Sequence, residues 1–232
     1  MSRTISTGCA VIAVASLAVA PAWAGGRPDD SSRNWFGQIG AGWAFAQGDA
    51  ADVLDDDWTF SGGVMYWPSD WPLGLSIEGA YTDFNLSNST LTAINDAIDQ
   101  DPNNDGNISG GSADYWQLAV NGVWSIGGNN GNGLYLTGGV GWYHVGAEVT
   151  QDGLVYYPPV CDPWFWWCFP GGVGPGTFIV GSVSSDEFGW NLGAGYSFEV
   201  TSGQVFIEAK YHQIQWENEN IDFIPVTIGF RW

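Results

Sequence analysis

The clearest candidate for metal chemistry in this sequence is the segment 101–114. Its start, Asp-Pro-Asn-Asn-Asp-Gly, places oxygen-bearing side chains at alternate positions before a glycine, which is the spacing of a calcium-binding loop. Position twelve, where such a loop has a bidentate glutamate, is Ser112, so an aspartate two residues later is the candidate replacement. The candidate ligands are Asp101, Asn103, Asp105, Asn107 and Asp114. Because Asn, Asp and Gly also dominate ordinary turns, calcium loop and plain turn both stay open. Calcium is the single cofactor that the sequence suggests.

Five other ionisable residues lie on the polar side of segments that otherwise alternate polar and apolar residues. They are Glu78, Glu208, Lys210, His212 and Arg231. A carboxylate next to a lysine or arginine is a possible acid–base pair. Buried charges require partners, however, so a structural ion-pair network is the favoured interpretation. A narrow conducting path lined by the same side chains is the alternative.

The overall charge excludes one class of partner. The 232 residues contain 25 Asp and Glu against 5 Lys and Arg, for a net charge of −20. Nucleic acid is therefore not expected as a partner, because binding it relies on Lys and Arg that neutralise phosphates. Glycine (34 residues) and tryptophan (15 residues) are abundant, and only 13% of the residues are charged. No stretch beyond the N-terminus has the 18 apolar residues of a spanning helix.

The N-terminus predicts export from the cytoplasm. Residues 1–24 contain a basic start at Arg3, a short apolar core and an Ala-Trp-Ala cleavage site, as in a secretory signal peptide. We predict a signal peptide over 1–24, a short periplasmic segment over 25–33 and one domain over 34–232. The two cysteines left after cleavage would lie in an oxidising compartment.

From residue 34 onward, apolar and polar residues alternate with a period of two, the pattern of β-strands. The predicted strands are Trp35–Phe45, Asp57–Trp67, Leu73–Asp83, Asp114–Ser125, Leu134–Val149, Glu187–Glu199, Gln204–Ile214 and Ile224–Trp232. One face of each is apolar with large aromatics near its ends, and the opposite face carries Gly, Ser, Asn, Gln and single charges. A β-sandwich does not bury such a polar face, whereas a transmembrane barrel turns it toward the lumen.

The connections between these strands alternate in length. Long ones are expected at 46–56, 84–113, 150–186 and 215–222, and short ones at 68–72, 126–133 and 200–203. Long extracellular loops and short periplasmic turns alternate in this way in outer-membrane barrels. The predicted fold is all-β: an eight-stranded antiparallel up-and-down transmembrane β-barrel with both termini on the periplasmic side.

Cys161 and Cys168 enclose a run of aromatic residues in the third long connection. The two cysteines are predicted to form a disulfide in the oxidising compartment. The run between them is Trp164, Phe165, Trp166 and Trp167. Consecutive aromatics are costly to expose to water without a use. They could fold over the barrel mouth, dip into the outer leaflet or contact a partner.

Three segments give the chain a resemblance to a known group of proteins. Leu192–Phe198, Ile207–Tyr211 and Pro225–Trp232 resemble the strands of small eight-stranded outer-membrane proteins, the OmpA-like, OmpX-like and opacity-type barrels. Such proteins usually end in phenylalanine with apolar residues at alternate positions before it. That ending is read by the barrel-assembly machinery, and its counterpart here is Ile228, Phe230 and Trp232, with tryptophan in place of phenylalanine.

The resemblance implies a Gram-negative outer-membrane protein whose partners are membrane lipid, lipopolysaccharide and the assembly machinery. Lipid-modifying enzymes also occur among eight-stranded barrels, and the deacylases need a His-x-Ser pair. Neither His144 nor His212 is followed by serine two positions later. No catalytic residue is therefore predicted. The expected function is a non-enzymatic, monomeric surface protein that acts through its acidic and aromatic loops, with a porin-like narrow conduit for small solutes or apolar molecules as the alternative.

Overall fold

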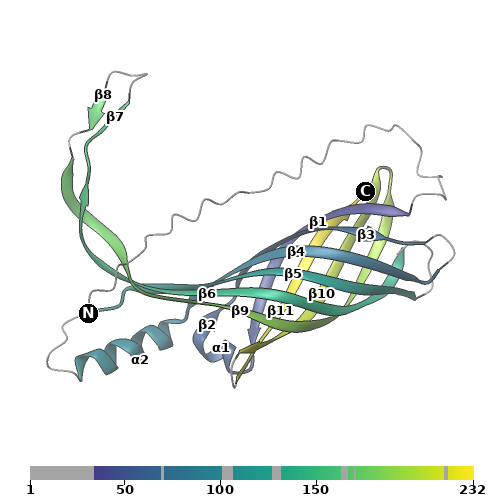
Figure 1. Cartoon of the computed structure of the whole chain (residues 1–232), viewed down its shortest axis with the longest axis horizontal. Helices are drawn as coiled ribbons and strands as arrows, with labels where there is room; N and C mark the ends of the chain where they lie inside the picture. Colours follow the sequence, from purple (N-terminus) through teal and green to yellow (C-terminus); the bar gives the residue numbers. More distant parts are fainter. Residues whose placement is uncertain are drawn as a thin grey trace.

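Eight long β-strands make up most of the computed structural model (Figure 1). The structure describes residues 34–68, 71–100, 107–126, 132–162, 167–169, 171–216 and 219–232. The predicted signal peptide and the segment 25–33 lie outside this range. The long strands are β1 (Trp35–Gln47), β3 (Asp57–Tyr66), β4 (Leu73–Leu86), β5 (Gly110–Ile126), β6 (Gly133–Tyr157), β9 (Gly172–Val200), β10 (Gly203–Trp216) and β11 (Glu219–Arg231).

Short elements lie in the connections. They are α1 (Ala50–Val53), β2 (Leu54–Asp55), α2 (Asn88–Asp99), β7 (Val160–Asp162) and β8 (Trp167–Phe169). Helix α2 begins after Ser87, whose Oγ accepts a hydrogen bond from the Thr90 backbone N–H and so caps the helix. Within the described residues, no helix has the length and apolar character needed to span a membrane.

The long strands close into a ring. Each is antiparallel to its neighbours in the order β1, β3, β4, β5, β6, β9, β10, β11. The ring closes because β11 also pairs with β1, from Gln38 opposite Arg231 to Gln47 opposite Asp222. The predicted eight-stranded antiparallel barrel is confirmed, and every strand within the ring has partners on both sides.

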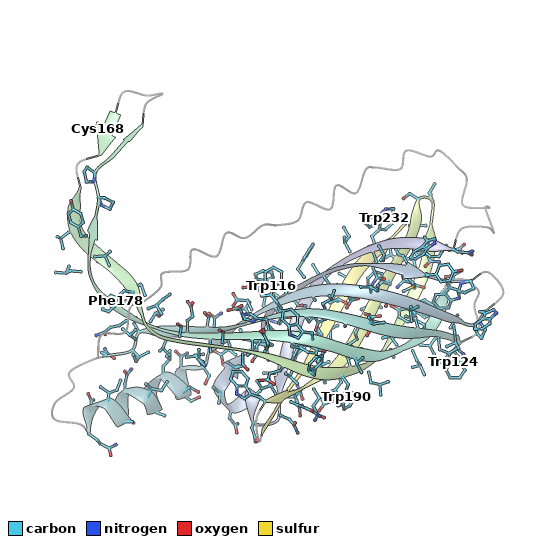
Figure 2. All side chains as sticks on the ribbon, viewed as in Figure 1. Trp116, Trp124, Cys168, Phe178, Trp190 and Trp232 are labelled. Carbon is cyan, nitrogen blue, oxygen red and sulfur yellow. The ribbon has the colours of Figure 1, made fainter. Side chains whose placement is uncertain are left out.

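The outward face of the barrel is apolar and has an aromatic girdle at each end. At the end carrying the long connections, the ring centroids of Trp58 and Tyr81 are 5.3 Å apart, and those of Tyr81 and Trp116 are 4.9 Å apart. At the other end, the rings of Trp35 and Tyr66 are 4.9 Å apart. Figure 2 shows Trp116 and Trp190 toward the first end and Trp124 and Trp232 toward the second. Exposed apolar side chains between two aromatic girdles are typical of a surface in contact with lipid.

Two predicted loops are wrong. Most of 150–186 continues β6 and β9 as a two-stranded ribbon, paired from Thr150 opposite Ile179 to Tyr157 opposite Gly172. Figure 1 shows this ribbon projecting well past the other strands. Its Gly, Pro and Ser residues indicate turns in the sequence, but here they alternate with Val, Ile and Phe and fit a strand. The predicted loop 215–222 is largely strand too, because β10 and β11 remain paired up to Trp216 opposite Glu219.

Candidate functional site

The barrel interior contains a polar middle layer in which the predicted ionisable residues meet. Lys210 Nζ lies 2.5 Å from Glu78 Oε1 and 3.0 Å from Glu208 Oε1. Gln38 Nε2 donates to the second oxygen of Glu78 at 2.9 Å. These side chains are all at least nine-tenths buried. They come from β1, β4 and β10, and their inward orientation follows directly from strand alternation.

Arg231 extends the polar layer toward the end where the short turns lie. Its Nε donates to Gln38 Oε1 at 3.3 Å, and its Nη1 donates to Gln204 Oε1 at 3.5 Å. The guanidinium lies 5.0 Å from the centre of the Phe206 ring and 5.5 Å from that of Tyr135. Arg231 therefore joins the network through amide groups and aromatic faces.

His212 packs with aromatic side chains and not with the ion-paired ones. It was expected in the ion-pair network, but its ring stacks on Phe223, with centroids 4.9 Å apart and an interplanar angle of 7°. Its Nδ1 shares a hydrogen bond of 2.9 Å with the Tyr143 hydroxyl. Two positions along β10 from Lys210, His212 reaches the apolar layer above the carboxylates.

Apolar layers lie at both ends of the polar middle layer. Toward the long connections, buried side chains from six long strands and β2 pack together: Ala44, Ala46, Leu54, Phe84, Ala113, Tyr115, Tyr143, Val145, Ile214 and Phe223. Toward the short turns, a second cluster consists of Met65, Trp67, Val123 and Tyr135. Neither layer follows from the sequence-based prediction, in which the inward faces of the strands are uniformly polar. The feature of the sequence that indicates these layers is the presence of large apolar residues on the inward face near strand ends, such as Phe84 and Phe223.

A small polar cavity remains between the apolar layers. Thr59, Ser61, Thr82, Gln117 and Thr227 line it together with the ion-paired side chains of the middle layer. Hydroxyls and amides can hold ordered water in such a space. Because side chains from every direction fill an eight-stranded barrel, the lumen is a packed interior with a local cavity.

The candidate calcium ligands divide between described and undescribed residues. Asp101, Asn103 and Asp105 lie outside the described residues. Asn107 precedes β5, and Asp114 lies in β5, opposite Asp83 of β4 and Gly146 of β6. In the part of the chain that the structure describes, no group of three His, Cys, Asp or Glu residues could hold a metal ion. Calcium binding therefore stays a prediction.

One histidine–carboxylate pair lies on the outward face, above the aromatic girdle. His144 Nδ1 is 2.6 Å from Asp186 Oδ1, and both side chains are well exposed. The two residues are direct cross-strand partners on β6 and β9. An exposed pair of this kind contributes at most about 1 kcal/mol to stability, so its effect on the pairing of β6 with β9 at the base of the ribbon is small.

The ribbon carries the predicted disulfide at its far end. Strands β7 and β8 pair Cys161 directly with Cys168. Trp164, Phe165 and Trp166 lie outside the described residues, and Trp167 begins β8. The register of β7 and β8 is the one that a Cys161–Cys168 bridge needs, and the bridge itself stays a prediction.

We expect reduction of the bridge to loosen the tip of the ribbon while the barrel stays folded. Reduction removes a short closed loop whose constraint is worth about 2 to 3 kcal/mol. Limited proteolysis with and without reductant would then cut between residues 157 and 172 sooner in the reduced protein. The Cys168→Ser variant should behave like the reduced protein under both conditions. Equal cleavage rates for oxidised and reduced protein would contradict the bridge.

The predicted assembly signal lies on the outward face of the last strand. Ile228 is exposed, and the rings of Phe230 and Trp232 stack with centroids 6.2 Å apart. The Trp232 backbone exchanges two hydrogen bonds of 3.0 Å with Gly37 at the start of β1. The two ends of the barrel domain are thereby joined at the turn end. Recognition by the assembly machinery stays a prediction.

Comparisons with known proteins found one matching family model and several similar solved structures. The family model described as outer membrane protein beta-barrel domain matches residues 9–232. Among solved structures, Ail of Yersinia pestis is 14% identical with a TM-score of 0.49, covering 86% of this chain and all of that one. The N-terminal barrel domain of Pseudomonas aeruginosa OprF is 13% identical with a TM-score of 0.39, covering 86% and 98%. Neisserial surface protein A is 14% identical with a TM-score of 0.41, covering 85% and 95%. No curated protein sequence matches the chain.

Proposed function

Because the chain belongs to the outer membrane protein β-barrel domain family, we propose that it is a non-enzymatic anchor that holds a protein-binding ribbon above the outer membrane. The observation that supports this is the length of β6 and β9. They continue to Tyr157 and from Gly172, far beyond the points where their neighbours β5 and β10 stop pairing with them. A strand of 29 residues greatly exceeds the roughly 9 to 11 residues that cross a bilayer.

In this proposal, the long connections and the ribbon face the outside of the cell, and the short turns and both termini face the periplasm. The exposed side chains of the ribbon support a binding role: Leu154 is 77% exposed, Val173 66% and Tyr156 64%. The barrel acts as a monomer in lipid and lipopolysaccharide. The apolar layers at both ends of the lumen favour an anchor over a conduit. An ion would have to lose its hydration water to cross such a layer, and the loss costs a large amount of free energy.

We expect the refolded protein to show no steady conductance in planar lipid bilayers. The reason is the combination of the Glu78–Lys210–Glu208 ion pairs with a packed apolar layer on either side. The matched control is the double variant Phe84→Ala and Phe223→Ala, which thins one apolar layer and leaves the ion pairs intact. Steady single-channel currents from the unaltered protein would favour the conduit instead.

A further inference from the structure

The ribbon leaves one long strand edge without a partner. Pairing between β9 and β10 ends at Gly189 opposite Ile214. From Gly176 to Phe188, β9 pairs only with β6 among the described residues. We call the opposite side of this stretch the β9 edge. Its backbone N–H and C=O groups point away from β6, and an unpaired edge of this kind is a template for another strand.

Most of the β9 edge lacks the lysines and prolines that usually protect exposed strands. Lysines, prolines and inward charges normally prevent an edge from pairing with other chains. Between Gly176 and Ser185 there is no proline and no charged residue. Side chains in this stretch favour β-structure and are exposed: Val183 and Ile179 are each 55% exposed, and Phe178 44%.

A register shift divides the β9 edge into two parts. It falls where Val149 faces Gly181 and Thr150 faces Ile179, which leaves Val180 as an extra residue. Such a bulge bends the strand locally. The part between the bulge and the barrel, Gly181–Phe188, is uninterrupted and has the length of an ordinary strand.

The charges near the β9 edge select the partner. Asp186 and Glu187 lie in β9, Glu148 lies opposite Ser182, and Asp152 lies opposite Thr177. After residue 33 the only Lys and Arg are Lys210 and Arg231, and both are buried inside the barrel. A second copy of this acidic chain would repel the first, and a polyanion would find no lysine or arginine on the outer surface of the barrel domain 34–232. A cationic strand has complementary charge.

We propose that the β9 edge over Gly181–Phe188 binds an extended, lysine- or arginine-bearing segment of another protein as an added antiparallel or parallel strand. This inference rests on the proposed anchoring function and places the contact at the base of the ribbon, where β6 also pairs with β5. Backbone hydrogen bonds supply the affinity in this mode of recognition, and alternate side chains supply the specificity.

The test uses the full protein in lipid nanodiscs and three synthetic peptides of about eight residues, the length of an ordinary strand. The first alternates valine and lysine, the second has the same sequence with N-methyl groups on all of its backbone amides, and the third has glutamate in place of lysine. We expect the first peptide to bind and to protect the amides of residues 181–188 from hydrogen exchange. N-methylation should weaken binding at least about tenfold, because neither side of the peptide can then donate a backbone hydrogen bond. The glutamate peptide should not bind.

Two protein variants locate the site. The double variant Ser182→Lys and Ser184→Lys places protective lysines on the edge. We expect it to lower the affinity for the lysine peptide by about tenfold or more. Ser182→Glu with Ser184→Glu is the matched control and should bind at least as tightly as the parent. Equal binding of the N-methylated peptide, or absence of binding by the lysine peptide, would overturn the strand-addition proposal. Neither result bears on the anchor function, which the conductance measurement tests separately.

Discussion

We expect Lys210→Met to lower the free energy of unfolding by about 3 to 5 kcal/mol, the usual cost of removing one partner from a buried ion pair. Lys210 Nζ lies between Glu78 and Glu208, and no bulk water compensates either carboxylate once the ammonium group is gone. Methionine keeps nearly the same length and fills the same space. The loss therefore reports the uncompensated charge of the carboxylates and not a cavity.

Urea unfolding in phospholipid vesicles, followed by tryptophan fluorescence, measures this loss. Ile207→Met is the matched control, since Ile207 lies on the lipid-facing side of the same strand and is 51% exposed. Adding Glu78→Gln and Glu208→Gln to Lys210→Met should recover part of the stability, because both uncompensated carboxylates are then gone and Arg231 keeps its amide partners Gln38 and Gln204. A loss under about 1 kcal/mol, the range of an exposed pair, would show that the polar layer is hydrated.

We expect Gly42→Val to prevent the closure of the barrel between its first and last strands. A Cβ atom on Gly42 would lie 1.9 Å from the Val226 carbonyl oxygen and 2.7 Å from Thr227 Cα. Both are backbone atoms of β11, so β1 and β11 would have to separate. The cost should exceed the roughly 3 kcal/mol of ordinary overpacking, because no side-chain rotation relieves the clash.

Gly62→Val is the control for this substitution. Gly62 lies on β3, and the nearest atoms to its added Cβ are the Gln38 carbonyl oxygen at 3.7 Å and Ile39 Cγ2 at 3.9 Å. Folded barrels resist unfolding by detergent until they are heated, so mobility in gel electrophoresis with and without heating reports the folded fraction. We expect Gly62→Val to fold like the parent and Gly42→Val to remain largely unfolded. Similar folded fractions for both variants would contradict the steric argument.

The faces of the strands could be predicted from sequence because β-strands alternate strictly. Glu208 and Lys210 are predicted to face inward and Ile207 outward, and the structure places them there. These features depend on local periodicity, which a single sequence displays directly.

Strand ends were less predictable than strand faces. Residues 150–186 were predicted as a loop because Gly, Pro and Ser are common in turns. In the ribbon these residues pair across two strands, and pairing stabilises them without any contribution from the membrane. The alternation of polar and apolar residues does not show at which residue a strand leaves the bilayer and continues as a free ribbon.

By itself, the sequence of this protein determined which side of each strand is polar, because alternation places every second residue on one face. Only the tertiary structure decided which polar side chains meet. Glu78 and Lys210 are 132 positions apart, and they come together because ring closure and strand register bring β4 and β10 face to face across the lumen. The register of the β10–β11 hairpin places His212 opposite Phe223, and the two rings stack there, away from the carboxylates. Pairing partners depend on register around the whole ring, a property that no local segment contains.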